Sequence, residues 1–318
     1  MILVCGEALI DLFVGEPIAE VLPTEAVAGG SPFNVAVALA RLGRPAAFLS
    51  TLSDDPFGDF LAARLARAGV HTGFLQRRAL RTTLSVVAPG ADGQARYSFY
   101  AEGGADRALT VADLPPSLPA DVNAIAAGSF ALGVEPVGGA IEALLRREGE
   151  RRVISLDPNV RPRVVGDLQA FRARFEAALP RATLVKGSAE DVELLYETLD
   201  LVAVARDWLR RGPQLVVLTR GEHGPLAALG ETILERPTPS VEVVDTVGAG
   251  DVFHAALLAH FDAAGRLTRD GVRALDRVAL TEALDFAAAA AAVVCTRRGA
   301  SPPSWAEVHE FIQFGGAR

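Results

Sequence analysis

Three small residues and a carboxylate stand between a β-branched segment and an apolar segment late in the chain. In Val-Val-Asp-Thr-Val-Gly-Ala-Gly-Asp-Val-Phe-His-Ala-Ala-Leu-Leu, residues 243–258, we expect a strand over 241–244 and a helix through 252–258. Gly248, Ala249 and Gly250 then fall on the first helical turn, where backbone N–H groups have no intrahelical partner. Small side chains let an anion approach these donors, so the turn suits a phosphate or a developing phosphoryl charge.

Asp251 belongs to the same predicted turn, where the field of the helix keeps its carboxylate ionised. An ionised carboxylate repels a bound anion, so it does not suit a site that only binds anions. It suits a site in which a neutral hydroxyl lies between the carboxylate and the anion. The carboxylate then accepts the hydroxyl proton while the amides stabilise the transferring phosphoryl group, which is the chemistry of a small-molecule kinase. Taken alone, these residues fit equally well a helix start with a favourable acidic residue and glycines that only form a tight turn.

Other nucleotide-binding designs do not fit the sequence. A P-loop needs lysine after a glycine-rich run, and the only lysine, Lys186, lies in Leu-Val-Lys-Gly instead. Protein kinases need His-Arg-Asp, and none of the five histidines is followed by Arg-Asp. A dinucleotide fingerprint needs a third glycine where this chain has Phe253.

Strand-like and helical segments alternate along most of the chain, as they must if strands are to position these residues. The expected strands are 2–8, 46–52, 124–128, 153–157, 183–185 and 215–219, and the expected helices are 34–42, 57–68, 136–147 and 168–179. This alternation is typical of an α/β fold with a mainly parallel central sheet covered by helices on both faces. We expect one large domain, residues 1–318, with a small insertion.

The insertion is a β-rich region without a helix. Residues 82–88 and 95–100 are separated by Pro-Gly-Ala-Asp-Gly-Gln, which predicts an antiparallel hairpin. A two-stranded hairpin is marginal in water, so it must pack on something. It could form a lid over an active site, a dimer interface or an ordinary edge hairpin.

Composition narrows the class of protein further. Half of the 318 residues are hydrophobic and 22% are charged, which indicates a globular chain. A net charge of −8 argues against a nucleic-acid surface and against anionic membranes. Cys5 and Cys295 form no CxxC pair, so a reducing cytoplasm fits best. The longest apolar run, 286–295, is about half of the roughly 20 residues that a membrane span needs, and the N-terminus lacks the basic region of a signal peptide. We expect a soluble, cytoplasmic protein.

Two segments resemble the signatures of the ribokinase-like (PfkB-type) carbohydrate kinase family. Residues 245–251, Asp-Thr-Val-Gly-Ala-Gly-Asp, are similar to the C-terminal signature, and residues 29–36, Gly-Gly-Ser-Pro-Phe-Asn-Val-Ala, followed by Leu42 and Gly43, to the N-terminal one. The similarity continues at 54–58 and 296–300 and covers essentially the whole chain. It implies a ribokinase-like α/β fold whose β lid is formed by segments near 11–28 and 75–105.

The resemblance implies a role for each matching residue on the sugar side. Asp251 would be the catalytic base, Gly248, Ala249 and Gly250 the anion hole, and Arg161 a phosphate or transition-state contact. The implied sugar-binding residues are Asp11, Gly29, Gly30, Asn34, Tyr100 and Asp157. Carboxylate and amide groups suit a sugar, because its hydroxyls both donate and accept hydrogen bonds.

On the nucleotide side, residues 186–191 and 219–224 resemble the segments that flank ATP. The implied nucleotide-binding residues are Lys186, Ser188, Asp191, Thr219, Gly221, Glu222 and Gly224. Mg²⁺ would be held mostly through water and ATP oxygens, as this ion prefers. The family also implies a monovalent cation (K⁺) site at Asp245 and the backbone of Val247, and a homodimer formed through the lid.

The resemblance is closest to the fructokinase branch, so we expect ATP-dependent phosphorylation of a primary hydroxyl of a neutral sugar, with fructose as the leading candidate. Ala101 stands where keto-deoxygluconate kinases commonly carry an arginine, which weakens the case for a carboxylate-bearing substrate. Ala288 stands where many members carry Asn or Cys near the adenine. Another sugar or nucleoside as substrate, and a catalytically silent sugar-binding regulator, are the alternatives.

Overall fold

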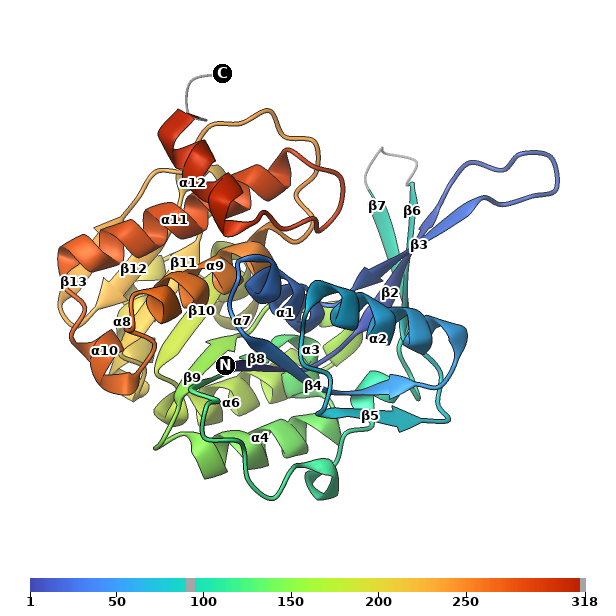
Figure 1. Cartoon of the computed structure of the whole chain (residues 1–318), viewed down its shortest axis with the longest axis horizontal. Coiled ribbons are helices and arrows are strands. Elements are labelled where there is room, and N and C mark those ends of the chain that lie inside the picture. Colours follow the sequence, from blue (N-terminus) through green and yellow to red (C-terminus); the bar gives the residue numbers. More distant parts are fainter. Residues whose placement is uncertain (90–94, 315–318) are drawn as a thin grey trace.

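The computed structural model describes residues 1–89 and 95–314, which form a large sheet covered by helices and a separate small sheet (Figure 1). The large sheet has nine strands in the order β13-β12-β11-β10-β9-β8-β1-β4-β5. Its strands are β1 (Ile2–Cys5), β4 (Ala46–Ser53), β5 (Leu75–Arg78), β8 (Ala124–Gly128), β9 (Val153–Asp157), β10 (Leu184–Ser188), β11 (Leu215–Thr219), β12 (Leu226–Leu229) and β13 (Thr232–Glu235).

The large sheet is parallel from β5 to β11, and an antiparallel pair, β12 and β13, extends one edge. Its helices are α1 (Ser31–Arg41), α2 (Pro56–Ala68), α3 (Ser129–Gly133), α4 (Val137–Glu148), α5 (Pro162–Val165), α6 (Leu168–Ala178), α7 (Ala189–Tyr196), α8 (Leu201–Arg211), α9 (Ala249–Ala263), α10 (Arg269–Arg273), α11 (Arg277–Cys295) and α12 (Trp305–Phe314). The predicted α/β fold is confirmed.

Both faces of the large sheet are buried. Strand β1 is an example, because its alternate side chains belong to the cores on opposite faces. Ile2 and Val4 belong to the core under α1, α9 and α11, whereas Leu3 and Cys5 belong to the core under α4 and α6. Successive side chains of a strand point to opposite faces, so a fully covered strand is apolar throughout. This explains why the parallel strands appear in the sequence as short, unbroken apolar runs.

The small sheet has the order β3-β2-β6-β7, with β2 (Leu9–Val14), β3 (Thr24–Gly29), β6 (Leu84–Pro89) and β7 (Ala95–Tyr100). The expected hairpin of 82–88 and 95–100 is confirmed as the antiparallel pair β6–β7, and its connection, 90–94, lies outside the described residues. The strand expected over 2–8 is divided: β1 ends at Cys5, and β2 leaves for the small sheet. The small sheet is therefore attached to the carboxyl end of β1, and β3 leads directly into α1.

The strand expected over 241–244 was wrong. Residues 236–248 contain neither helix nor strand, and Val243 and Val244 are exposed. The N–H groups of Val244 and Asp245 both donate to the Cys295 carbonyl, at 2.9 and 3.2 Å. The edge of the sheet is already taken by β13, so this β-branched segment runs to the end of α11 instead. The predicted helix start is confirmed, because α9 begins at Ala249.

Within the described residues, α11 is the one helix long and apolar enough to cross a membrane by length and composition. About two-thirds of that stretch, 67%, is buried inside the molecule, where α11 packs on α9. It is therefore a core helix, and its many alanines allow α9 to approach closely.

Candidate functional site

The predicted site residues converge at the carboxyl ends of the central strands. Asp157 ends β9, Lys186 lies in β10, and α9 begins beside them with Asp251 in its first turn. In open α/β sheets this edge is where ligands bind. Residues that are distant in sequence are thus brought together by the sheet order β10-β9-β8-β1.

Asp251 is buried and is held by two side chains from α1. Its Oδ1 accepts a hydrogen bond from the Ser31 hydroxyl at 2.6 Å, and its Oδ2 accepts one from the Asn34 amide at 2.8 Å. Burial raises the pKa of Asp251, while Ser31, Asn34 and the charge of Lys186 act to lower it. A carboxylate in this balance is fixed in orientation and more basic than an exposed aspartate, as a general base should be.

The start of α9 offers backbone donors next to this carboxylate. The Ala249 N–H donates to the Thr246 carbonyl at 3.2 Å, so it is less available than we expected from the sequence. The N–H groups of Gly250 and Asp251 have no acceptor within the described part of the chain. Gly248 caps the helix at φ +79°, and a Cβ there would lie 2.6 Å from the Cβ of Ala300, so the turn requires glycine.

Lys186 lies beside these donors. It is only 3% exposed, its Nζ donates to Asp157 Oδ2 at 2.9 Å, and a Cβ added to Gly250 would meet that Nζ at 3.3 Å. Burial alone would lower the pKa of Lys186, but the charges of Asp157, Asp191 and Asp251 outweigh it and raise the pKa. A permanent positive charge therefore lies beside the first turn of α9 and near Asp251, although the resemblance implied only a place on the nucleotide side for Lys186.

Ser188 and Asp191, predicted for the nucleotide, are engaged with each other. They form the capping box of α7: the Ser188 hydroxyl accepts from the Asp191 N–H at 3.0 Å and donates to Asp191 Oδ2 at 2.7 Å. Asp191 Oδ1 accepts from the Val160 N–H at 2.7 Å. This pair therefore fixes the loop after β9, where Asp157 and Arg161 lie.

The predicted sugar side is built around Asp11, which lies in strand β2 and is partly buried. Burial raises the pKa of Asp11, while the Ser85 hydroxyl and the charge of Arg161 lower it. Gly29 lies diagonally across from it on the neighbouring strand β3, where it pairs with Leu9. A Cβ on Gly29 would be 2.1 Å from Asp11 Oδ2, so the carboxylate occupies the space that a side chain would fill. Gly30 is the N-cap of α1. Asp11, Arg161 and Asp251 thus border the same region.

Tyr100 is not brought to this region. The register places Asp11, Ser85 and Phe99 in one row across the small sheet, and Ile10, Leu84 and Tyr100 in the next. Neighbouring rows point to opposite faces, so Tyr100 lies on the face away from Asp11, and it is 66% exposed. Phe99 holds the position that we had expected for Tyr100.

The remaining nucleotide-side residues lie at the end of β11. The Thr219 hydroxyl donates to the Gly187 carbonyl at 3.2 Å, and the turn of Gly221 and Glu222 follows. Gly224 has φ +73°, and a Cβ there would lie 2.0 Å from the Arg236 carbonyl oxygen. Gly221 and Glu222 are thus exposed in the loop after β11, whereas Thr219 is half-buried at the end of that strand and Gly224 is buried.

The predicted cation ligands join two loops. Asp245 Oδ1 accepts from the Val247 N–H at 3.0 Å, and Oδ2 accepts from the Gly299 N–H at 2.8 Å. Within the described residues no group of three or more His, Cys, Asp or Glu side chains could hold a metal ion.

Several polar residues near the site were not predicted. Ser31 lies in the motif 29–36, and Asn159 lies in the loop after β9, where its Nδ2 is 3.5 Å from Asp251 Oδ1. Glu7 and Asp106 are almost completely buried near Asp11, and burial raises their pKa values to about 8 and about 7. Burial of a carboxyl group depends on tertiary packing, so no local pattern could have identified these two.

Comparison with known proteins agrees with this geometry. Residues 1–307 match the pfkB family carbohydrate kinase pattern. The chain belongs to this family. It is 40% identical over 285 residues to a fructokinase of Rhizobium leguminosarum bv. trifolii, which covers 90% of this chain and 87% of the relative. The resemblance inferred from the two signatures is therefore confirmed.

Solved structures of the family have the same fold. The crystal structure of a fructokinase from Xylella fastidiosa with bound ATP superposes with a TM-score of 0.89 at 32% identity, covering 98% of both chains. A fructokinase double mutant from Vibrio cholerae O395, with fructose, ADP and a potassium ion bound, gives a TM-score of 0.84 at 28% identity, covering 98% of this chain and 97% of the other. This chain therefore has the ribokinase-like fold, and its family is one of phosphotransferases that act on carbohydrates.

The contact between Gly29 and Asp11 yields a test of the sugar side. Gly29→Ala would displace the Asp11 carboxylate, so we expect the KM for the sugar to rise about 10- to 100-fold, the loss of a charged hydrogen bond. Gly15→Ala is the matched control, because a Cβ at Gly15, at the end of β2, meets only ordinary contacts at 3.6 Å. A coupled assay of ADP release measures both. An unchanged KM in Gly29→Ala would show that Asp11 does not contact the sugar.

Proposed function

We propose that this kinase is an ATP-dependent fructokinase in which Asp251 removes the proton from a primary hydroxyl of the sugar. The observation that carries this proposal is a buried carboxylate, fixed by Ser31 and Asn34. Beside it lie the N–H groups of Gly250 and Asp251, which have no acceptor among the residues that the structure describes. The identity to curated fructokinases supports fructose as the sugar.

In this proposal Asp251, the N–H groups at the start of α9 and Lys186 each have a role in the phosphoryl transfer. The sugar hydroxyl would lie between Asp251 and the start of α9. Its oxygen would bond to the γ-phosphorus of ATP as the bond from that phosphorus to the bridging oxygen breaks and ADP leaves, while the hydroxyl proton passes to a carboxylate oxygen of Asp251. The N–H groups of Gly250 and Asp251 and the ammonium of Lys186 then face the negative charge that develops on the phosphoryl oxygens. A fixed donor set of this kind needs no reorganisation during the reaction.

ATP would lie along the ends of β10 and β11, over Thr219, Gly221 and Gly224. Mg²⁺ would screen the phosphate charges and would be held largely by phosphate oxygens and water. Among the carboxylates predicted for this side, Asp191 is engaged by Val160 and Ser188, so the exposed Glu222 is the one that we propose for contact with the ion or its waters. Arg161, at the start of α5, would contact the transferring phosphate from the sugar side.

The small sheet would act as the lid over the sugar. Asp11 in β2 and Gly29 at the end of β3 present polar groups on the face that borders Arg161 and Asp251. Closing this sheet over the site would exclude water, which could otherwise accept the phosphoryl group.

The proposed base is tested by Asp251→Asn. We expect kcat to fall by about 10² to 10⁴, the contribution of general base catalysis, while sugar binding persists because the amide keeps the shape of the site. Asp262→Asn, on the same helix but paired with Arg44, is the control and should keep full turnover. Steady-state kinetics and calorimetric titration of the sugar measure the two effects. Retained turnover in Asp251→Asn would contradict the mechanism.

The choice of sugar is tested by ADP release over a panel of fructose, ribose, tagatose phosphate, keto-deoxygluconate and a nucleoside. We expect the highest kcat/KM for fructose. A higher kcat/KM for another compound would overturn fructose as the substrate, and sugar binding without ADP release would overturn the kinase activity itself.

The proposed cation site at Asp245 and the Val247 backbone is tested by running the same panel with and without K⁺. We expect a higher kcat with K⁺.

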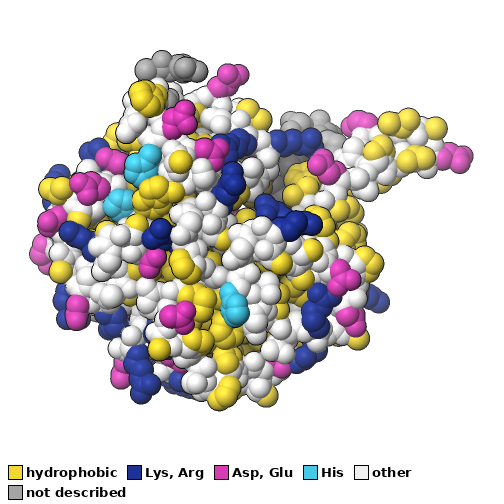
Figure 2. All heavy atoms as spheres, viewed as in Figure 1, with side chains coloured by type: hydrophobic (Ala, Val, Ile, Leu, Met, Phe, Trp, Pro, Cys, Tyr) yellow, Lys and Arg dark blue, Asp and Glu magenta, His cyan; other side chains and the backbone are white. Residues whose placement is uncertain are grey.

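We also propose that two copies pair through their lids. The connection between β2 and β3 projects from the body of the protein, and Figure 2 shows apolar atoms along this arm. Ile18, Val21 and Leu22 on this arm are 69%, 64% and 53% exposed. An arm with such residues in water is stabilised when a second copy covers it.

Leu22→Asp tests this pairing. An added charge on the covered arm should shift a dimer toward monomer, measured by sedimentation over a range of concentrations. Val111→Asp, at an exposed valine on a 3₁₀ turn outside the small sheet, is the control and should leave the dimer intact. A monomeric parent protein, or a dimeric Leu22→Asp protein, would contradict the proposal.

We place the enzyme in the cytoplasm, where its substrates would be available. Cys5 and Cys295 are both free thiols, which is compatible with a reducing compartment. Fractionation of the source cells, followed by immunodetection, would test this location.

A further inference from the structure

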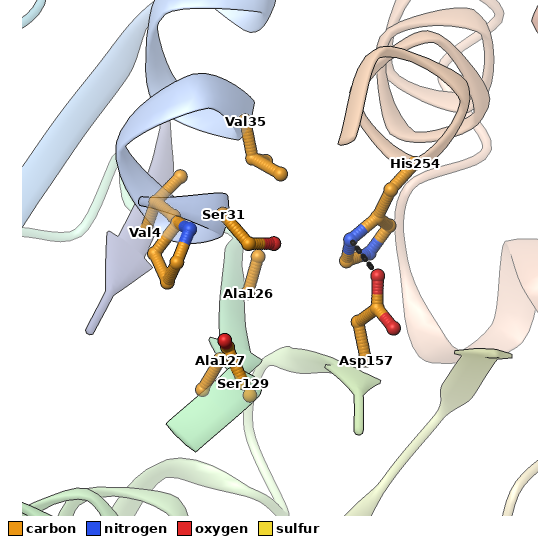
Figure 3. A pocket seen from close by; sticks show the side chains of 10 residues that line it. Val4, Ser31, Val35, Ala126, Ala127, Ser129, Asp157 and His254 are labelled. Atoms are coloured by element: carbon orange, nitrogen blue, oxygen red, sulfur yellow. Dashed lines mark ion pairs between the residues drawn. The ribbon is translucent and has the colours of Figure 1, made fainter. Parts of the chain in front are cut away.

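A small cavity of about 10 Å³ lies next to Ser31, the residue whose hydroxyl donates to Asp251. It lies between α1, β8, the end of β9 and α9, and Figure 3 shows the side chains that line it. Its walls are apolar at Val35 and Ala126, and Asp157 and His254 face each other across one end. A volume of about one water-sized sphere, with polar groups at one end, is what a single buried water needs.

Asp157 and His254 each present an unpaired polar atom. They are 4% and 2% exposed, and within the described residues neither Asp157 Oδ1 nor His254 Nδ1 has a hydrogen-bond partner. Buried polar atoms without partners are rare, and water commonly supplies the missing bond. The Asp157 Oδ2 atom is already taken by Lys186.

The direct contact between the two residues does not satisfy them. His254 Nδ1 lies 3.8 Å from Asp157 Oδ2, the pair joined by the dashed line in Figure 3, and this is too long for a hydrogen bond. Burial and the charge of Lys186 lower the pKa of His254 to about 3, so the ring is neutral and the contact is not an ion pair. His254 Nε2 is 2.6 Å from the Ser155 hydroxyl.

We propose that one water molecule occupies this cavity between His254 Nδ1 and Asp157 Oδ1, and that His254 acts through it as a positioning residue for the Asp157–Lys186 pair. The Ser155 hydroxyl donates to Nε2, Nδ1–H donates to the water oxygen, and the water donates to Asp157 Oδ1. This tautomer places the ring proton toward the negative carboxylate, which stabilises it. The chain Ser155–His254–water–Asp157–Lys186 then holds the ammonium at the anion-binding turn.

The water and the tautomer are tested without any assay of activity. A crystal structure should show one water within hydrogen-bond distance of Asp157 Oδ1 and His254 Nδ1. ¹⁵N NMR of protein labelled at its five histidines should show His254 neutral, with the proton on Nδ1, from about pH 5.5 to about pH 8, where ordinary histidines titrate. A dry cavity, a proton on Nε2, or a titration in this range would overturn the proposal.

The positioning role is tested by two variants that remove the water in different ways. His254→Phe keeps a ring but removes both nitrogens, and Ala126→Val fills the cavity while His254 stays. This second test depends on the proposed phosphoryl-transfer activity. We expect kcat to fall about 10-fold in both, because a buried charged acceptor loses a donor, with KM for the sugar changed less than about twofold.

Two matched variants separate this effect from general damage. Ala124→Val lies on the same face of β8 but does not line the cavity, and His260→Phe replaces another histidine of α9. Both should keep kcat. If the controls lose as much kcat as the test variants, or if the test variants keep full kcat, His254 has no positioning role. A parent protein without kinase activity would overturn the proposed function alone, since the water and the tautomer would still be observable.

Discussion

The buried ammonium of Lys186 is the positive charge that balances the carboxylates gathered at the carboxyl ends of the central strands. It is only 3% exposed, and the carboxylates of Asp157, Asp191 and Asp251 all raise its pKa. Removing a carboxylate from water costs several kcal/mol per ion when no opposite charge lies nearby. A buried ion pair adds little net stability compared with an apolar core, so this arrangement is better explained by the reaction than by folding. It places positive charge where a phosphoryl group would become more negative.

The same centre depends on positions where the backbone carries no side chain. Asp11 Oδ2 lies where a Cβ of Gly29 would be, and Lys186 Nζ lies 3.3 Å from the place of a Cβ on Gly250. Charged groups therefore reach the backbone donors and the sugar region because glycine leaves that space open. Within the two signature motifs, Gly29 and Gly250 are the glycines that face a charged side chain, whereas Gly30 and Gly248 are required by their positive φ angles and by close neighbours.

Structural features that depend on local sequence patterns were predicted correctly from the sequence. Features that depend on contacts between distant segments were not. Alternating strands and helices predicted the α/β fold, and the small residues before Asp251 predicted the start of α9. The β-branched residues at 241–244 suggested a strand, but β13 already holds the sheet edge. Tyr100 was predicted to face the sugar, although the side of the sheet on which it lies depends on the register of β6 with β2. His254 lies in an apolar helix and gave no signal, because its partners come from β9.

Asp251 lies between the residues of α1 and β10 that set its basicity and the small sheet that carries Asp11. In the mechanism that we propose, the reaction and the choice of sugar therefore depend on different residues. Ser31, Asn34 and Lys186 lower its pKa while burial raises it, so its basicity is set by residues that surround the centre on the side of α1 and β10. Asp11 belongs to the small sheet, and only the charge of Asp251 links it to this balance, since that charge raises the pKa of Asp11. If the small sheet is the lid that we propose, its residues can therefore change the sugar that is bound while the contacts of Asp251 with α1 and Lys186 stay the same.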